Sequence, residues 1–80
     1  MSLRFVSASQ RFIGEVWAGM LPGEYDTAIY EVPEGADPAV VDVNACVMLD
    51  ICGEYDSHSG AVKDLLNNLE YYDEATPVCV

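Results

Sequence analysis

The apolar positions of this 80-residue chain change their spacing along its length, which indicates a mixture of strands and helices. Residues 3–8 alternate loosely and predict a short strand. Residues 25–32 are rich in strand-favouring side chains and stop at Pro33, so they predict the best-defined strand. A helix over about residues 60–72, with Ser59 placed to cap it, is predicted by one apolar stripe: Val62, Leu65, Leu66, Leu69 and Tyr72.

The apolar segment after the first strand fits two structures. In residues 11–21 the apolar positions recur at i, i+1, i+4, i+5, i+8 and i+9, as on one face of a helix. Gly14 and Gly19 oppose that interpretation by about 1 kcal/mol each relative to alanine. The alternative is a strand over residues 11–18 that forms a hairpin with residues 3–8.

The middle of the chain is also open to two interpretations. Asp37-Pro38 is a typical start for a helix, with the acid as N-cap and proline in the first helical position. The apolar run over residues 39–52 is then either one buried helix that ends at Gly53, or a short helix followed by a buried strand over residues 45–52. Its valines slightly favour the second interpretation.

These elements predict one domain over residues 1–80 of the α+β class, with a short, mostly antiparallel sheet packed with two or three helices. Residues 76–80 fit a terminal strand, with Pro77 at its first or an edge position. A hydrophobic content of 51% is too high for a disordered acidic chain. Because no run approaches the roughly 18 apolar residues of a membrane span and no secretion signal is visible, we expect a cytoplasmic protein that binds no membrane.

Charge changes the picture more than any motif does. The chain has 14 acidic and 3 basic residues, a net charge of −11. After Arg11 the one base is Lys63, so residues 12–80 carry 14 acids and one base, a net charge of −13. Since like charges oppose compaction, this imbalance indicates solubility, salt adaptation or a basic partner. Direct binding of nucleic acid is disfavoured, because each contacted phosphate requires a cation.

No arrangement of side chains predicts catalysis. The cysteines are odd in number and contain no Cys-x-x-Cys pair, so we expect reduced thiols rather than a disulfide framework: Cys46, Cys52 and Cys79. His58 stands between two serines, with no sign of a Cys/His catalytic pair. One further group matches neither a calcium loop nor a zinc spacing: Asp50, Glu54, Asp56 and His58. We therefore expect no enzyme activity, no metal and no cofactor.

Some acids stand where stability alone would not place them. Glu70, Asp73 and Glu74 lie at the negative end of the last predicted helix, where each costs from a few tenths to about 1 kcal/mol. The alternative is that this helix ends near Asn68 and the acids are simply solvated. Three acidic groups and their neighbouring tyrosines form the predicted partner-binding set: Glu24, Asp26, Glu54, Tyr55, Asp56, Glu70, Tyr71, Asp73 and Glu74.

In size, folded character and the acidity of residues 15–74, the chain resembles small phage-encoded acidic inhibitors of the anti-CRISPR and anti-restriction DNA-mimic type. No motif is shared, so no family residue is carried over. The resemblance implies an inhibitor that occupies the basic DNA or RNA groove of a nucleic-acid-binding protein or complex, such as a CRISPR–Cas effector. If the protein is phage-encoded, it would act in the host cytoplasm.

Charge density limits this hypothesis. Spread evenly over about 4,700 Å², the acids would be about threefold sparser than the charges of duplex DNA, so mimicry requires most of them on one face. Two alternatives remain. One is a protein–protein interaction module or subunit of a cellular complex without nucleic-acid mimicry. The other is salt adaptation of a generally acidic proteome.

Overall fold

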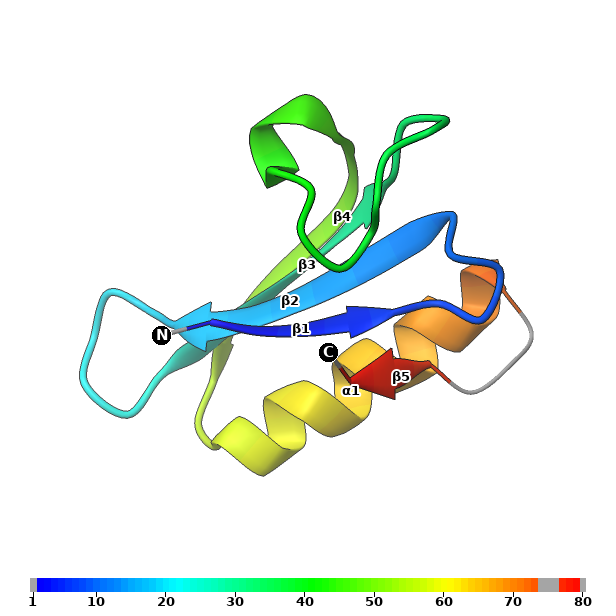
Figure 1. Ribbon diagram of the computed structural model, residues 1–80. Helices are drawn as coiled ribbons and strands as arrows, with labels where there is room; N and C mark the ends of the chain where they lie inside the picture. Colours follow the sequence, from blue (N-terminus) through cyan, green and yellow to red (C-terminus); the bar gives the residue numbers. More distant parts are fainter. Residues whose placement is uncertain (1, 74–76, 80) are drawn as a thin grey trace.

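A computed structural model describes residues 2–73 and 77–79, and within them five strands form one antiparallel sheet with a single α-helix on one face (Figure 1). The strands are β1 (Leu3–Val6), β2 (Phe12–Ala18), β3 (Tyr25–Glu31), β4 (Val47–Tyr55) and β5 (Val78–Cys79). The helix is α1 (His58–Tyr72), and one 3₁₀ turn, η1 (Val43–Ala45), precedes β4. The strand order is β4-β3-β2-β1-β5, and every neighbouring pair is antiparallel.

The prediction of two or three helices is wrong, first because residues 12–18 form a strand. β2 is covered on both faces: Val16 belongs to the core under α1, and Ile13 to a second core on the opposite face. A strand buried on both sides loses its alternating pattern, which explains the helix-like spacing. Gly14 lets the helix approach, since a Cβ at this position would lie 2.9 Å from Leu65 Cδ1.

The second expected helix is also absent. After Asp37, whose Oδ1 accepts a hydrogen bond from the Ala39 N–H at 3.0 Å, the chain makes a turn and continues to η1 without forming an α-helix. Several valines in this stretch lower its helix propensity. A single helix over residues 39–52 is therefore wrong. The alternative of a short helix followed by a buried strand over residues 45–52 is right only about the strand: η1 is a three-residue 3₁₀ turn, and β4 is exposed rather than buried.

The last helix begins two residues earlier than expected and ends where predicted, at Tyr72. Ser57, not Ser59, is its N-cap, because the Ser57 Oγ accepts a hydrogen bond from the Gly60 N–H at 3.1 Å. The alternative end near Asn68 is wrong. Along the sheet, β3 matches the predicted strand over residues 25–32 to within one residue.

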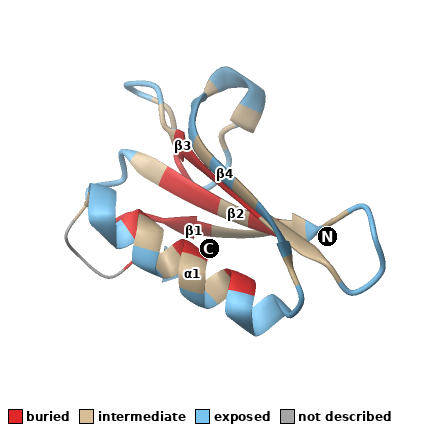
Figure 2. Ribbon diagram, turned by 180° about the vertical axis from the view of Figure 1, so that it is seen from behind, coloured by how far each residue is buried: buried red, intermediate tan, exposed pale blue. Residues whose placement is uncertain are grey.

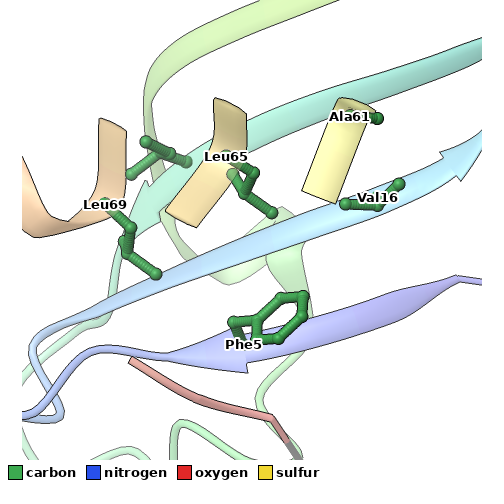
Figure 3. Close-up of a cluster of buried hydrophobic side chains, with 6 residues drawn as sticks. Phe5, Val16, Ala61, Leu65 and Leu69 are labelled. Carbon is green, nitrogen blue, oxygen red and sulfur yellow. The ribbon is translucent and has the colours of Figure 1, made fainter. Parts of the chain in front are cut away.

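We call the side of the sheet under α1 the helix face. Its core joins three sheet side chains to three from the helix: Phe5, Val16, Ile29, Ala61, Leu65 and Leu69. In Figure 3, the Leu65 and Leu69 side chains extend from α1 toward the sheet, where Phe5 lies on β1. This packing fixes the helix mainly over the two central strands β2 and β3.

We call the opposite side the loop face, because residues 33–46 cross it. Its core is formed by Val6, Ile13, Ala28 and Tyr30, against which Val41, Val43 and Cys46 of the connection pack. Arg4 fastens the connection: its Nη1 donates to the carbonyl oxygens of Pro38 at 3.0 Å and Val41 at 2.8 Å, while its Nε donates to Glu15 Oε2 at 2.8 Å.

Candidate functional site

The register of β3 and β4 brings two of the three predicted acidic groups together. Tyr25 pairs with Tyr55, so the acids on either side of each tyrosine meet where β3 begins and β4 ends. We call this group the acidic end: Glu24, Asp26, Glu54 and Asp56. No local pattern in the sequence indicates this pairing, because the two groups are about 30 residues apart.

A β-bulge organises the acidic end. Between the pairs Thr27–Cys52 and Tyr25–Tyr55, the single residue Asp26 lies opposite both Gly53 and Glu54. The Asp26 Oδ1 accepts a hydrogen bond from the Glu54 N–H at 3.2 Å, and Glu54 has a φ of 65°. This left-handed backbone conformation is uncommon for glutamate and is found mainly at turns and functional sites. The Asp26 carboxylate therefore holds Glu54 in its position.

Gly53 makes room for that carboxylate. A Cβ at Gly53 would lie 2.6 Å from Asp26 Oδ1, closer than any unstrained contact. The bulge therefore depends on a glycine beside an acid, and the two residues restrict each other's replacement.

The tyrosines of this end are engaged within the fold. The Tyr55 hydroxyl donates a hydrogen bond to Asp64 Oδ2 on α1, and its ring packs against the core of the helix face. Burial, together with this hydrogen bond, raises the pKa of Tyr55 above its ordinary value, so the phenol stays protonated at neutral pH. Tyr25 contacts the ring of His58 edge-on, with centroids 5.2 Å apart. Tyr55, predicted to contact a partner, thus attaches the end of β4 to the helix.

The acidic end carries charge without a neutralising partner. In the described part of the chain the ion pairs are Arg4–Glu15 and Arg11–Glu31, and neither involves the acidic end. Lys63 is the nearby cation in sequence; it lies on α1, where it lines a surface hollow with Tyr55 and Asp64. The start of α1 adds a positive partial charge next to Asp56. Of the four acids, Glu54 and Asp56 are exposed, whereas Glu24 and Asp26 are half-buried.

The third predicted group lies elsewhere, at the other end of the helix. α1 has 15 residues, so its ends are about 22 Å apart. Glu70 and Tyr71 are exposed near its C-terminus, with Tyr71 86% exposed (Figure 2). Glu74 lies outside the described residues. The predicted site residues therefore do not form one surface.

Asp73 has a structural role that the sequence analysis did not anticipate. Its Oδ2 accepts a hydrogen bond from the Ser9 N–H at 2.6 Å, which connects the end of α1 to the turn between β1 and β2. Hydrogen bonds from the side chain and backbone of Ser9 hold the pKa of the Asp73 carboxyl below its usual value. Stability therefore does explain this acid. The partner is 64 residues away, and no local pattern indicates it.

A second feature that the sequence analysis missed is the apolar edge of the sheet. β4 is the outermost strand, and Figure 2 shows it largely exposed while the central strands are buried. Four large apolar side chains on it are solvent-accessible: Val47, Met48, Leu49 and Ile51. The run was expected to be buried because apolar content alone does not distinguish an edge strand from a central one.

No group of three or more histidine, cysteine or acidic side chains among residues 2–73 and 77–79 is arranged to hold a metal ion. Cys46 and Cys52 are free thiols, and burial raises the pKa of Cys46. Within the same residues, no helix combines the length and apolar character needed to cross a membrane.

The chain matches no protein-family model, no curated protein and no solved structure.

Proposed function

We propose that this protein is a cytoplasmic acidic inhibitor that binds the basic nucleic-acid groove of a DNA- or RNA-binding protein or complex, such as a CRISPR–Cas effector. The observation that carries the proposal is the acidic end, where two pairs of acids meet without an ion pair in the described part of the chain. Neither acid pair alone would distinguish the chain from any acidic protein.

Charge density supports the acidic end as the contact surface. Fourteen acids spread over the 4990 Å² of exposed surface would give one per about 360 Å², against about one per 100 Å² for duplex DNA taken as a rod about 20 Å across. At the acidic end the spacing is closer. Alternate residues of a strand lie about 6.6 Å apart and neighbouring strands about 4.8 Å apart. On these backbone spacings the four acids are denser than the average over the surface.

The same geometry accounts for selectivity between partners. Neighbouring carboxylates lie within the Debye length of about 8 Å at physiological salt, so their fields add. They repel phosphates and attract the lysines and arginines that line a nucleic-acid groove. Binding is therefore expected to be fast and to weaken steeply as salt increases.

The test is displacement of a fluorescent duplex from a panel of guide-loaded CRISPR–Cas effectors and restriction enzymes. The variant Glu54→Gln/Asp56→Asn removes two charges from the acidic end. The control Glu34→Gln/Asp37→Asn removes two exposed charges from the connection over the loop face, outside the predicted partner-binding residues. We expect the wild type and the control to displace the duplex from at least one panel member, and the first variant to be about tenfold weaker with a shallower salt dependence. No displacement by the wild type, or equal effects of the two variants, would refute the proposal.

A second candidate is an interaction module without nucleic-acid mimicry, and the apolar edge of β4 favours it. Such a module would bind its partner without competing with nucleic acid. Its affinity would also change little between low and high salt, because apolar contacts are not screened. The displacement assay separates the two candidates, because a module that does not compete leaves the duplex bound at every salt concentration.

A further inference from the structure

β4 is an open edge of unusual length for so small a sheet. It has nine residues, whereas the other outer strand, β5, has two. An edge strand presents a row of unpaired N–H and C=O groups, and natural proteins usually protect it with lysine, proline or a short length. Val47–Tyr55 contains no lysine and no proline. Its protection consists of two register irregularities and the acid Asp50.

The apolar side chains of β4 continue the core of the loop face outward. Met48 pairs with Tyr30 and Ile51 pairs with Ala28, and both partners belong to that core. Met48 is nevertheless 50% exposed and Ile51 59% exposed. A further strand beside β4 would cover these side chains and satisfy the outward-facing backbone groups at the same time.

The two faces of β4 differ in charge, which restricts what can pair with it. On the helix face, Asp50 pairs with Ile29 and Cys52 with Thr27. The strand then leads into the bulge with Glu54 and the acidic end. An added strand therefore meets apolar side chains on the loop face, the carboxylate of Asp50 on the helix face, and the acidic end where β4 ends. The complementary sequence alternates apolar and basic residues.

A second copy of this chain does not meet that requirement. Each copy carries a net charge of −11, so two copies repel as they approach. Pairing two β4 strands about their middle would also bring the two Asp50 carboxylates near each other, and like charges on paired strands are destabilising.

We infer that β4 is a strand-addition site for an extended segment of the basic partner, with apolar side chains alternating with lysine or arginine. This inference rests on the proposed function, because the same partner supplies the cations for the acidic end. Backbone hydrogen bonds along β4 supply the orientation, and the carboxylates select basic sequences over others.

The probe is an eight-residue peptide of alternating valine and lysine, with blocked ends and a fluorescent label. The matched control peptide is N-methylated at alternate residues, which removes the hydrogen bonds of one edge and keeps every charge. Binding is measured by anisotropy to the full chain, and backbone amide exchange is followed by NMR. We expect the methylated peptide to bind at least about tenfold more weakly, and the amides of β4 to exchange about tenfold more slowly when the unmodified peptide is bound.

Protein variants give an independent comparison. Ile51→Thr should weaken peptide binding about threefold, since one apolar cross-strand contact is lost. Val40→Thr is the matched control, because Val40 is also exposed, at 77% against 59% for Ile51, but lies in the connection over the loop face. If Ile51→Thr fails to fold, the two peptides still decide the question on the wild type.

The outcomes separate this inference from the proposed function. Absence of binding by the unmodified peptide, binding of both peptides within twofold, or protection of amides outside β4 would overturn strand addition. If both peptides bind equally well to the wild type and both bind more weakly to Glu54→Gln/Asp56→Asn, the results support the acidic end as the binding surface and exclude strand addition. If methylation weakens binding but the charge variant binds normally, strand addition stands and the charge-based function fails.

Discussion

The bulge at Asp26, Gly53 and Glu54 predicts that Gly53→Ala destabilises the wild type but stabilises a variant that lacks the Asp26 carboxylate. In Gly53→Ala the new Cβ would meet Asp26 Oδ1 at 2.6 Å, against at least about 3.4 Å for an ordinary contact. The carboxylate must therefore move by close to 1 Å. That movement breaks its 3.2 Å hydrogen bond from the Glu54 N–H.

The expected cost is the sum of three effects. Losing a hydrogen bond to an exposed carboxylate costs about 1 kcal/mol, at the lower end for charged groups. Forcing Asp26 away from its rotamer costs about 1 kcal/mol more. Alanine restricts the unfolded chain and returns about 0.4–1 kcal/mol, because Gly53 does not have a positive φ. Gly53→Ala should therefore lower the free energy of unfolding by about 1–1.5 kcal/mol.

Removing the carboxylate should reverse the effect. In an Asp26→Ala background nothing opposes the Gly53 Cβ, so only the unfolded-state gain remains and Gly53→Ala should stabilise by about 0.5 kcal/mol. Urea unfolding of the four proteins in this double-mutant cycle measures the coupling directly. By thermal unfolding, the drop in the wild-type background should be roughly 4–10 °C. If Gly53→Ala stabilises both backgrounds equally, Asp26 does not hold the bulge.

Two further predictions concern the contacts that fix the loops. Asp73→Asn should lower stability at neutral pH, because the ionised carboxylate accepts the Ser9 hydrogen bond. Since the pKa of Asp73 in the folded protein is below the unfolded value of about 3.9, the wild type should lose this advantage as the pH falls below 4. Urea unfolding between pH 2 and 7 would then show the stabilities of the two proteins converging. A constant difference across that range would contradict the assignment. Arg4→Met keeps the apolar stem but removes three hydrogen bonds and leaves half-buried Glu15 unpaired. We expect the free energy of unfolding to fall by about 2 kcal/mol and proteolysis within residues 33–46 to become faster. Unchanged cleavage of that connection would show that Arg4 does not hold it.

Two elements could be predicted from the sequence, for different reasons. β3 was indicated by its strand-favouring side chains before Pro33, although both of its faces are buried. α1 has one apolar stripe facing the sheet and polar residues elsewhere, so its period is visible. β2 has no such pattern because it is covered on both faces, and its spacing imitated a helix. β4 is apolar although it is an exposed edge strand, and composition alone indicates burial for such a run.

The candidate site divides in the same way. The positions of the acids are visible in the sequence. Whether the acids of β3 lie beside those of β4 depends on the pairing of Tyr25 with Tyr55. That register follows from the bulge and from the long connection before β4. The contact of Asp73 with Ser9 likewise depends on how the helix end meets a distant turn. Local propensities carry no information about such long-range neighbours, so the acidic end had to be seen in three dimensions.

The place of β5 in the sheet has a consequence for the order of folding. β1, β2, β3 and β4 are neighbours in chain order, so each can pair with the strand made just before it. β5 instead pairs with β1, joining Phe5 to Cys79 across nearly the whole chain. Closing so long a loop for two residues is slow and offers little gain until α1 has docked. During synthesis, β1 therefore begins as an outer strand and becomes an inner one last, whereas β4 joins early and remains at the edge.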